Sequence, residues 1–392
     1  MEFDIYNWNK RQAAQLQLLL DSNISDTDKK LIQSYLKYRV ETDNISVPTV
    51  VRYLSAFRVI AESFTGSFSD LTEVKVKSIL STLFSRMVRH GSGGLQDMSD
   101  SNKRNYARAF KSLLEYMQTH GYANVNPGWV RSPRKPPPKR LKSYELLTWE
   151  DILLLSSVAL TSRDQAIVQV LFDSGLRIGE LLTLEIRDVE VIYDGAAINL
   201  HLRQSKTIVR DVVIVRSAPA LLDYLQAHPN KQGSSKVFLN NCSPFHPMLY
   251  DSARKILRDI MKRSPIRKPV NPHSFRKSSV SHVAHVLNES ELKTRFGWTQ
   301  DSRMFNTYVH MDERRVNNHF LEIEGVVEPG VKQQQEFALK PQTCAWCNKI
   351  NPLGAVYCSQ CKRPLNAQES FITVQHKQFL DIVSPKVRKF QL

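Results

Sequence analysis

The chain has 392 residues, 42% of them hydrophobic, so it is long enough for two or three domains with buried cores and cannot be wholly disordered. Its formal net charge of +16 indicates a polyanionic partner, because each lysine or arginine near a phosphate releases a condensed counterion. No apolar run reaches the roughly 18 residues that span a bilayer, and the N-terminus has no secretory signal, so we expect no membrane contact and a reducing, cytoplasmic setting.

Residues 1–125 carry apolar side chains at three- and four-residue spacing, which is the period of an amphipathic helix. Leu31, Tyr35 and Leu36 form one such stripe, and Phe110 and Leu114 belong to a later one. The segment therefore predicts a small, all-helical domain.

Residues 126–147 are rich in proline and in basic side chains, a composition typical of a linker. The basic residues are Arg131, Arg134, Lys135, Lys139, Arg140 and Lys142. One interpretation is a solvated, charged linker. The other is a strap across a phosphate backbone, since a proline-rich segment holds its charges extended, and on this interpretation we assign these residues to DNA binding.

Residues 148–325 combine helical patterns with one strand pattern and predict a mixed α/β domain. An apolar helix is expected from Gln165 to Phe172. Between Val189 and Val215, two apolar runs flank Gln204 to Thr207, which has the composition of a hairpin turn. The fold predicted for the whole chain is mostly α with a small β-sheet.

Residues 340–366 hold four of the five cysteines, arranged as two C-x2-C pairs that ten residues separate. They are Cys344, Cys347, Cys358 and Cys361. Two such pairs suit tetrahedral Zn2+, so we predict a structural zinc ribbon that binds either DNA or a partner chain. A redox role is the poorer alternative, because no strand–helix context flanks either pair. Residues 367–392 form a basic tail with a helical pattern.

Three segments of residues 148–325 resemble the motifs of the tyrosine recombinase family, in the family's order. They are Asp173-Ser174-Gly175-Leu176-Arg177-Ile178-Gly179-Glu180-Leu181, His273-Ser274-Phe275-Arg276, and the stretch from Phe296-Gly297-Trp298 to Tyr308. The resemblance covers roughly residues 148–325, and the helical segment before them looks like the family's core-binding domain, which clamps DNA. The zinc ribbon and the stretch around Trp298 look like archaeal integrases, so an archaeal or bacterial, nucleoid-associated protein is expected.

The resemblance implies catalytic roles for Arg177, Lys206, His273, Arg276, Trp298 and Tyr308, with Glu180 supporting Arg177. Arginines suit the clamping of two phosphate oxygens by their bidentate geometry. Lys206 is preferred as the general acid over Arg203 and Arg210, because the pKa of a guanidinium is too high for that role. Trp298 stands where most members have histidine, and it can donate a hydrogen bond but cannot accept a proton. A buried tryptophan that caps the core is the alternative.

The resemblance further implies an integrase that cuts and rejoins double-stranded DNA through a 3′-phosphotyrosine, without ATP or a catalytic metal. Recombination of this kind joins two duplexes and so implies a homotetramer on DNA. Two alternatives are kept: a topoisomerase of type IB, which uses the same nucleophile chemistry, and a zinc-ribbon DNA-binding regulator whose catalytic set has decayed. All the expected positions are filled, which argues against decay.

Overall fold

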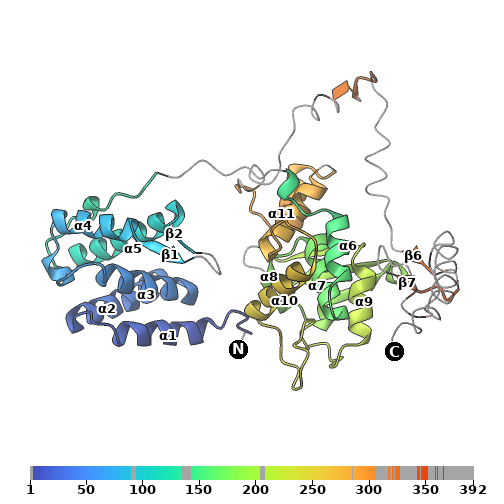
Figure 1. Ribbon diagram of the computed structural model, residues 1–392, viewed down its shortest axis with the longest axis horizontal. Helices are drawn as coiled ribbons and strands as arrows, with labels where there is room; N and C mark the ends of the chain where they lie inside the picture. The colour runs from blue at the N-terminus through green and yellow to red at the C-terminus, as the bar shows by residue number, and fades with distance from the viewer. Residues whose placement is uncertain are drawn as a thin grey trace, which may run out of the picture. The chain divides into compact units, whose positions relative to one another are not determined.

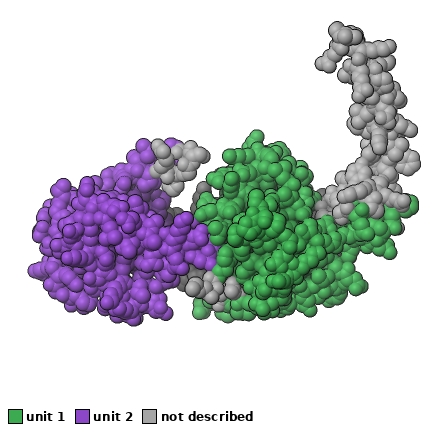
Figure 2. Space-filling view, turned by 90° about the horizontal axis from the view of Figure 1, so that it is seen from below, with its two compact units in different colours: residues 1, 3, 139–392 green, residues 2, 4–138 purple. Residues whose placement is uncertain are grey.

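The computed structural model describes residues 3–89, 94–134, 143–203, 208–284 and 286–302, together with short stretches and single positions beyond them up to residue 365. Contacts between residues divide the chain into two compact units, residues 4–138 and 139–392, which Figure 2 shows in separate colours. Each unit is built around its own elements (Figure 1).

The first unit is a bundle of helices around an aromatic core. Its helices are α1 (Trp8–Leu20), α2 (Asp26–Asp43), α3 (Val47–Ala61), α4 (Glu73–Phe84) and α5 (Asp100–Thr119), with short 3-10 turns η1 (Phe68–Asp70) and η2 (Pro127–Trp129). Hydroxyl caps begin several of them: the side chains of Ser25 and Ser99 accept hydrogen bonds from the main-chain N–H groups of Asp28 and Asn102. Helix α3 packs against α1 and α5.

The prediction of an all-helical first domain was wrong in one detail. Strands β1 (Met87–Arg89) and β2 (Leu95–Asp97) pair as an antiparallel hairpin between α4 and α5. Each strand has three residues, so neither is long enough to show the alternation of apolar and polar side chains by which a strand is recognised in sequence.

The second unit gathers its helices around α7. The helices are α6 (Trp149–Ser157), α7 (Ser162–Ser174), α8 (Ile178–Thr183), α9 (Ala218–Gln226), α10 (Tyr250–Arg263), α11 (Pro272–Val283) and α12 (Glu289–Phe296), with 3-10 turns η3 (Ser143–Glu145), η4 (Ile186–Asp188) and η5 (Tyr193–Gly195). Helix α7 contacts α6, α9 and α11 (Figure 1). Apolar side chains cover most of its circumference, as expected of a helix buried on all sides.

A three-stranded antiparallel sheet in the order β3-β4-β5 flanks these helices. The strands are β3 (Val189–Ile192), β4 (Ala197–Leu202) and β5 (Arg210–Ile214). Leu202 at the end of β4 pairs with Arg210 at the start of β5, which confirms the predicted hairpin, while its turn at residues 204–207 lies outside the described residues. A further pair of short strands, β6 (Gln342–Thr343) and β7 (Ile350–Asn351), lies in the cysteine region.

The prediction of a mostly helical fold with a small sheet is confirmed. Among the helices that the structure describes, none combines the length and the apolar character needed to cross a membrane.

Candidate active site

The turn between α7 and α8 positions Arg177 and Glu180. Gly175 ends α7 in the left-handed conformation, with φ at 61°, and Arg177 then precedes the first turn of α8. Glu180 lies three residues later and reaches back, as the third helical residue of a capping box does. Its Oε2 accepts from the Arg177 main-chain N–H at 2.9 Å, and its Oε1 accepts from Arg177 Nη1 at 2.9 Å.

Glu180 also binds Arg210 of strand β5. Arg210 Nη1 and Nη2 donate to Oε1 and Oε2 of Glu180, each at 3.1 Å, and both side chains are almost fully buried. Burial acts to raise the pKa of Glu180, but hydrogen bonds and charges from Arg210 and Arg177 outweigh it and lower the pKa to about 2. Glu180 is therefore ionised across the physiological range and is shared by two guanidinium groups.

Arg276 reaches the same turn from α11. Asn271 caps this helix by accepting from the main-chain N–H groups of His273 and Ser274. Arg276 is 5% exposed, and its Nη1 donates to the carbonyl of Gly175 at 2.9 Å, across 101 positions of sequence. Its Nη2 donates to the carbonyl of Phe296. The structure thus brings Arg177 and Arg276, from two separate motifs, to one turn.

His273 lies one turn before Arg276 on α11, and its side chain reaches the surface. Partial loss of solvent and the charges of Lys277 and Arg276 lower the pKa of His273 below its ordinary 6.5. The lowered pKa favours the neutral imidazole at neutral pH, the form that can accept a proton.

Trp298 follows the left-handed Gly297, whose φ is 59°, at the end of α12. Its side chain is 4% exposed and stacks on Phe296 with ring centroids 5.7 Å apart. The Arg276 guanidinium carbon lies 6.0 Å from the centroid of the Trp298 ring. Trp298 is therefore a core residue that also lies beside one candidate clamp, as the alternative interpretation of this residue expected.

Two expected catalytic residues, Lys206 and Tyr308, lie outside the described residues. The structure describes the elements that precede them: β4 ends at Leu202, four positions before Lys206, and Trp298 lies ten positions before Tyr308. Their roles stay predictions.

Arg210 is the residue that the sequence analysis did not assign to the site. In the sequence, Arg210 stands out only as a competitor of Lys206 for the role of acid. A signal was present, because Arg210 alternates with Val212 and Ile214 and so lies on the buried face of β5. An arginine on a buried strand face needs an acidic partner, but the sequence does not reveal that this partner is Glu180.

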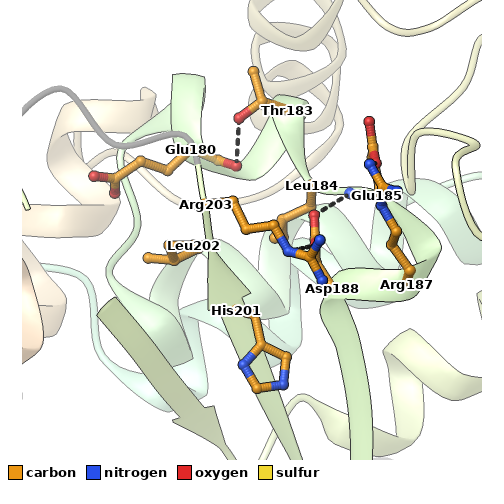
Figure 3. A pocket seen from close by; sticks show the side chains of 9 residues that line it. All are labelled: Glu180, Thr183, Leu184, Glu185, Arg187, Asp188, His201, Leu202 and Arg203. Carbon is orange, nitrogen blue, oxygen red and sulfur yellow. Dashed lines mark hydrogen bonds and ion pairs between the residues drawn. The ribbon is translucent and has the colours of Figure 1, made fainter. Parts of the chain in front are cut away.

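A surface pocket lies beside this site but is not its centre. Its lining residues are Glu180, Thr183, Leu184, Glu185, Arg187, Asp188, His201, Leu202 and Arg203 (Figure 3). Arg203 Nε lies 2.7 Å from Asp188 Oδ1, and Arg187 Nη2 lies 2.6 Å from Glu185 Oε2. Figure 3 shows the Glu180 carboxylate pointing away from these pairs. The lining contains neither Arg177 nor Arg276, so the pocket does not hold the candidate clamp.

Of the basic residues of the predicted linker, the structure describes two, Arg131 and Arg134, and both are exposed. The main-chain carbonyl of Arg134 accepts from Arg104 Nη1 of α5 at 3.0 Å, which ties the start of the linker to the helical unit. Lys135, Lys139, Arg140 and Lys142 lie outside the described residues.

Three of the four predicted zinc ligands lie together. The sulfur atoms of Cys344, Cys347 and Cys358 are all within 4.8 Å of one another, and the Sγ atoms of Cys347 and Cys358 are 3.5 Å apart. Zinc–sulfur bonds of about 2.3 Å in a tetrahedron place the sulfurs about 3.8 Å apart, so this spacing fits such an ion. Cys361 lies outside the described residues.

Comparison with known proteins finds a family match within the second unit and distant relatives that cover more of the chain. Residues 146–315 match the model of the phage integrase family. The tyrosine recombinase XerD of Listeria monocytogenes serotype 4b (strain F2365) is 25% identical over 288 residues, covering 67% of this chain and 87% of that protein. Transposase A from transposon Tn554 of Staphylococcus aureus is 24% identical, covering 69% of this chain and 74% of the relative.

Solved structures share the fold. A lambda integrase dimer bound to a COC′ core site matches with a TM-score of 0.55 at 15% identity, covering 73% of this chain and 77% of that one. The XerH site-specific recombinase bound to its difH substrate matches with a TM-score of 0.52 at 16% identity, covering 83% of this chain and 97% of that one. The chain thus contains a phage integrase domain at residues 146–315 and is similar to tyrosine recombinases over about two thirds of its length.

Proposed function

We propose that this recombinase cuts and rejoins duplex DNA through a covalent bond between Tyr308 and a 3′ phosphate. The observation that carries the proposal is the meeting of Arg177 and Arg276 at the α7–α8 turn, where the Arg276 guanidinium binds the carbonyl of Gly175. Two fixed guanidinium groups are suited to stabilise the charge that develops on the non-bridging oxygens of a phosphodiester.

In the proposed reaction the Tyr308 oxygen attacks the scissile phosphorus and displaces the 5′ oxygen of the next nucleotide. Lys206 gives its proton to that leaving oxygen, while the neutral imidazole of His273 takes the proton of the tyrosine hydroxyl. A 5′ hydroxyl of a partner strand then attacks the phosphotyrosine and gives its proton to Lys206, while the departing Tyr308 oxygen takes back the proton held by His273. The bond energy is retained in the phosphotyrosine, so no ATP is needed. The arginines supply the positive charge on the phosphate oxygens, so the proposed reaction uses no catalytic metal.

We propose that the helical unit binds the DNA backbone along α5. Arg104, Arg108 and Lys111 recur at four- and three-residue spacing on this helix, and Arg108 and Lys111 are exposed. Arg104 also contacts the main chain of Arg134, so the basic start of the linker continues the same charged surface. Exposed cations in a row suit phosphates, and the chain carries a net charge of +16 to support such contacts.

Four protomers on two duplexes are proposed for the complete reaction, because a strand exchange requires two cut duplexes. The related lambda integrase was solved as a dimer on a core site, and the XerH recombinase on its difH substrate.

We further propose that Cys344, Cys347, Cys358 and Cys361 hold one structural Zn2+. Support comes from the clustering of three of the sulfurs and from the β6–β7 hairpin, where the main-chain N–H of Cys344 donates to the Lys349 carbonyl at 2.9 Å. The ion would be surrounded by four thiolates and would stabilise the ribbon without taking part in catalysis.

The nucleophile is tested with a nicked DNA substrate that traps the covalent intermediate. The wild-type protein is expected to give an adduct that survives denaturation, and Tyr308→Phe none, because the phenol oxygen is the attacking atom. Tyr250→Phe, at the first residue of α10, serves as the control and is expected to form the adduct. An adduct that persists in Tyr308→Phe would assign the nucleophile elsewhere. Relaxation of a plasmid that lacks a matched site would support the topoisomerase alternative.

A further inference from the structure

Arg210 joins three elements of the phage integrase domain. From strand β5, its Nη1 and Nη2 donate hydrogen bonds to the carboxylate of Glu180 on α8. Its Nε donates to the carbonyl of Arg295 on α12 at 2.9 Å. Its side chain is 5% exposed. An arginine in such a position loses its hydration, and the bidentate carboxylate and the carbonyl replace it.

At the end of α12, three successive main-chain carbonyls each accept a hydrogen bond from a different arginine. The carbonyl of Arg295 accepts from Arg210, that of Phe296 from Arg276, and that of Gly297 from Arg177 Nη2 at 3.4 Å. The last carbonyls of a helix lack N–H partners within the helix and carry the negative end of its dipole. The end of α12 therefore places Arg210 next to both candidate phosphate clamps.

The close approach of Arg210 requires the glycine at position 297. A Cβ atom there would lie 2.4 Å from Arg210 Nη1 and 2.8 Å from its guanidinium carbon. The left-handed φ of 59° at Gly297 adds a second reason for glycine. The backbone is thus shaped to admit this guanidinium.

Arg210 also changes the charge that surrounds Arg177. Arg177 alone with Glu180 would be a neutral ion pair, whereas two guanidinium groups on one carboxylate leave one positive charge in excess. Glu180 Oε1 accepts from both arginines, at 2.9 Å from Arg177 Nη1 and at 3.1 Å from Arg210 Nη1. The two nitrogens of Arg210 fix the orientation of the carboxylate that also binds Arg177.

We propose that Arg210 is a positioning residue for Arg177: by fixing Glu180 and the end of α12, it sets the place and the charge of the guanidinium that clamps the scissile phosphate. Arg210 itself does not touch the phosphate. The proposal rests on the clamping role of Arg177 proposed above.

The test compares Arg210→Gln and Arg210→Lys with a matched control in the same domain. Arg163 is also a buried arginine: its Nε donates to Asp164 Oδ1 at 2.9 Å and its Nη1 to the carbonyl of Leu239 at 2.8 Å. It lies at the start of the 13-residue helix α7, whereas the α7–α8 turn follows the other end, about 18 Å away along the helix axis. Arg163→Gln therefore reproduces the loss of a buried ion pair away from the candidate clamp.

Adduct formation is measured in single turnover at saturating DNA, with the Kd for DNA and the melting temperature measured beside it. Arg210→Gln is expected to slow the chemical step about 100-fold with little change in Kd, because a misplaced clamp costs mainly transition-state binding. Arg210→Lys restores the charge and is expected to recover part of the rate. Arg163→Gln is expected to lower the melting temperature and keep the rate of the wild type.

A rate for Arg210→Gln no lower than that of Arg163→Gln would overturn the proposal, as would a loss found entirely in Kd. A second readout needs no activity: the NMR signal of the Arg177 Nε–H should shift and broaden in Arg210→Gln but not in Arg163→Gln. If the wild type forms no adduct, the proposed function fails, and the NMR comparison still decides whether Arg210 positions Arg177.

Discussion

At the scale of single residues, Glu180 shows how burial and charge compete. Burial disfavours its ionised form, yet the guanidinium groups of Arg210 and Arg177 lower its pKa from 4.5 to about 2. A carboxyl group whose pKa is lower in the folded than in the unfolded state stabilises the fold above its unfolded pKa. That stability is lost as the pH falls from about 4.5 towards 2.

We expect Glu180→Gln to lower the free energy of unfolding by about 3 kcal/mol at pH 7, and by progressively less below pH 4.5. Urea unfolding at a series of pH values measures this difference between variant and wild type. Glu190→Gln is the control: this carboxylate of β3 is exposed and lies 3.2 Å from His201 Nε2, and its loss should change the free energy of unfolding by less than about 1 kcal/mol at pH 7. A penalty in Glu180→Gln that stays constant down to pH 3 would contradict the lowered pKa.

At the scale of elements, the C-terminus of α7 brings the two arginine motifs together. Gly175 ends this helix with φ at 61°, and a Cβ atom there would lie 2.3 Å from a ring carbon of Phe296 and 2.7 Å from Ser279 Oγ. Its carbonyl accepts from Arg276. Glycine is therefore required for the left-handed conformation and for the close packing of Ser279 of α11 and Phe296 of α12.

Gly175→Ala is expected to destabilise the second unit by about 2–4 kcal/mol, the sum of left-handed strain and overpacking. Gly195→Ala is the comparison, because φ there is also positive, at 90°, but a Cβ would meet only Leu222 at 3.5 Å and Ile350 at 3.9 Å. It should cost about 1 kcal/mol, from strain alone. Thermal unfolding of both variants gives the two losses of stability. Equal losses would show that the side chains of Phe296 and Ser279 move aside and that overpacking adds nothing.

The sequence predicts local motifs, helices and strands, but it does not predict contacts between residues that are far apart in the chain. Glu180 reaches Arg177 within one helical turn, so a local motif predicts the pair, and the alternation of Val212 and Ile214 predicts strand β5. The contact of Arg210 with Glu180 joins residues 30 positions apart and depends on how β5 packs against α8. No local pattern encodes that packing, so the role of Arg210 required the structure.

At the scale of the whole molecule, the cysteine region is attached to the integrase domain. Lys349, in the hairpin loop before β7, lies with its Nζ 3.0 Å from Asp223 Oδ1 of α9, and both side chains are largely buried. The loop also includes Asn348, whose φ is 57° and whose main-chain N–H donates to the Cys344 carbonyl. A bound zinc ion that orders this loop would therefore also fix the ion pair to α9.

We expect the purified protein to contain one zinc per chain, and Cys344→Ser to lose most of it, because a tetrahedral site needs all four thiolates. Elemental analysis by mass spectrometry measures the metal. Cys242→Ser is the matched control, since this exposed cysteine lies outside the cluster. Zinc retained in full by Cys344→Ser would remove that cysteine from the ligand set.

The three carbonyls at the end of α12 have a consequence for the timing of catalysis. Guanidinium groups repel one another, and gathering them around a phosphate normally requires solvent and side chains to rearrange during the reaction. Here Arg177 and Arg276 are already held by main-chain oxygens at one helix end, and Arg210 is held by the carbonyl next to theirs. If Arg177 and Arg276 bind the phosphodiester as proposed, it meets donors that are preorganised and do not have to move.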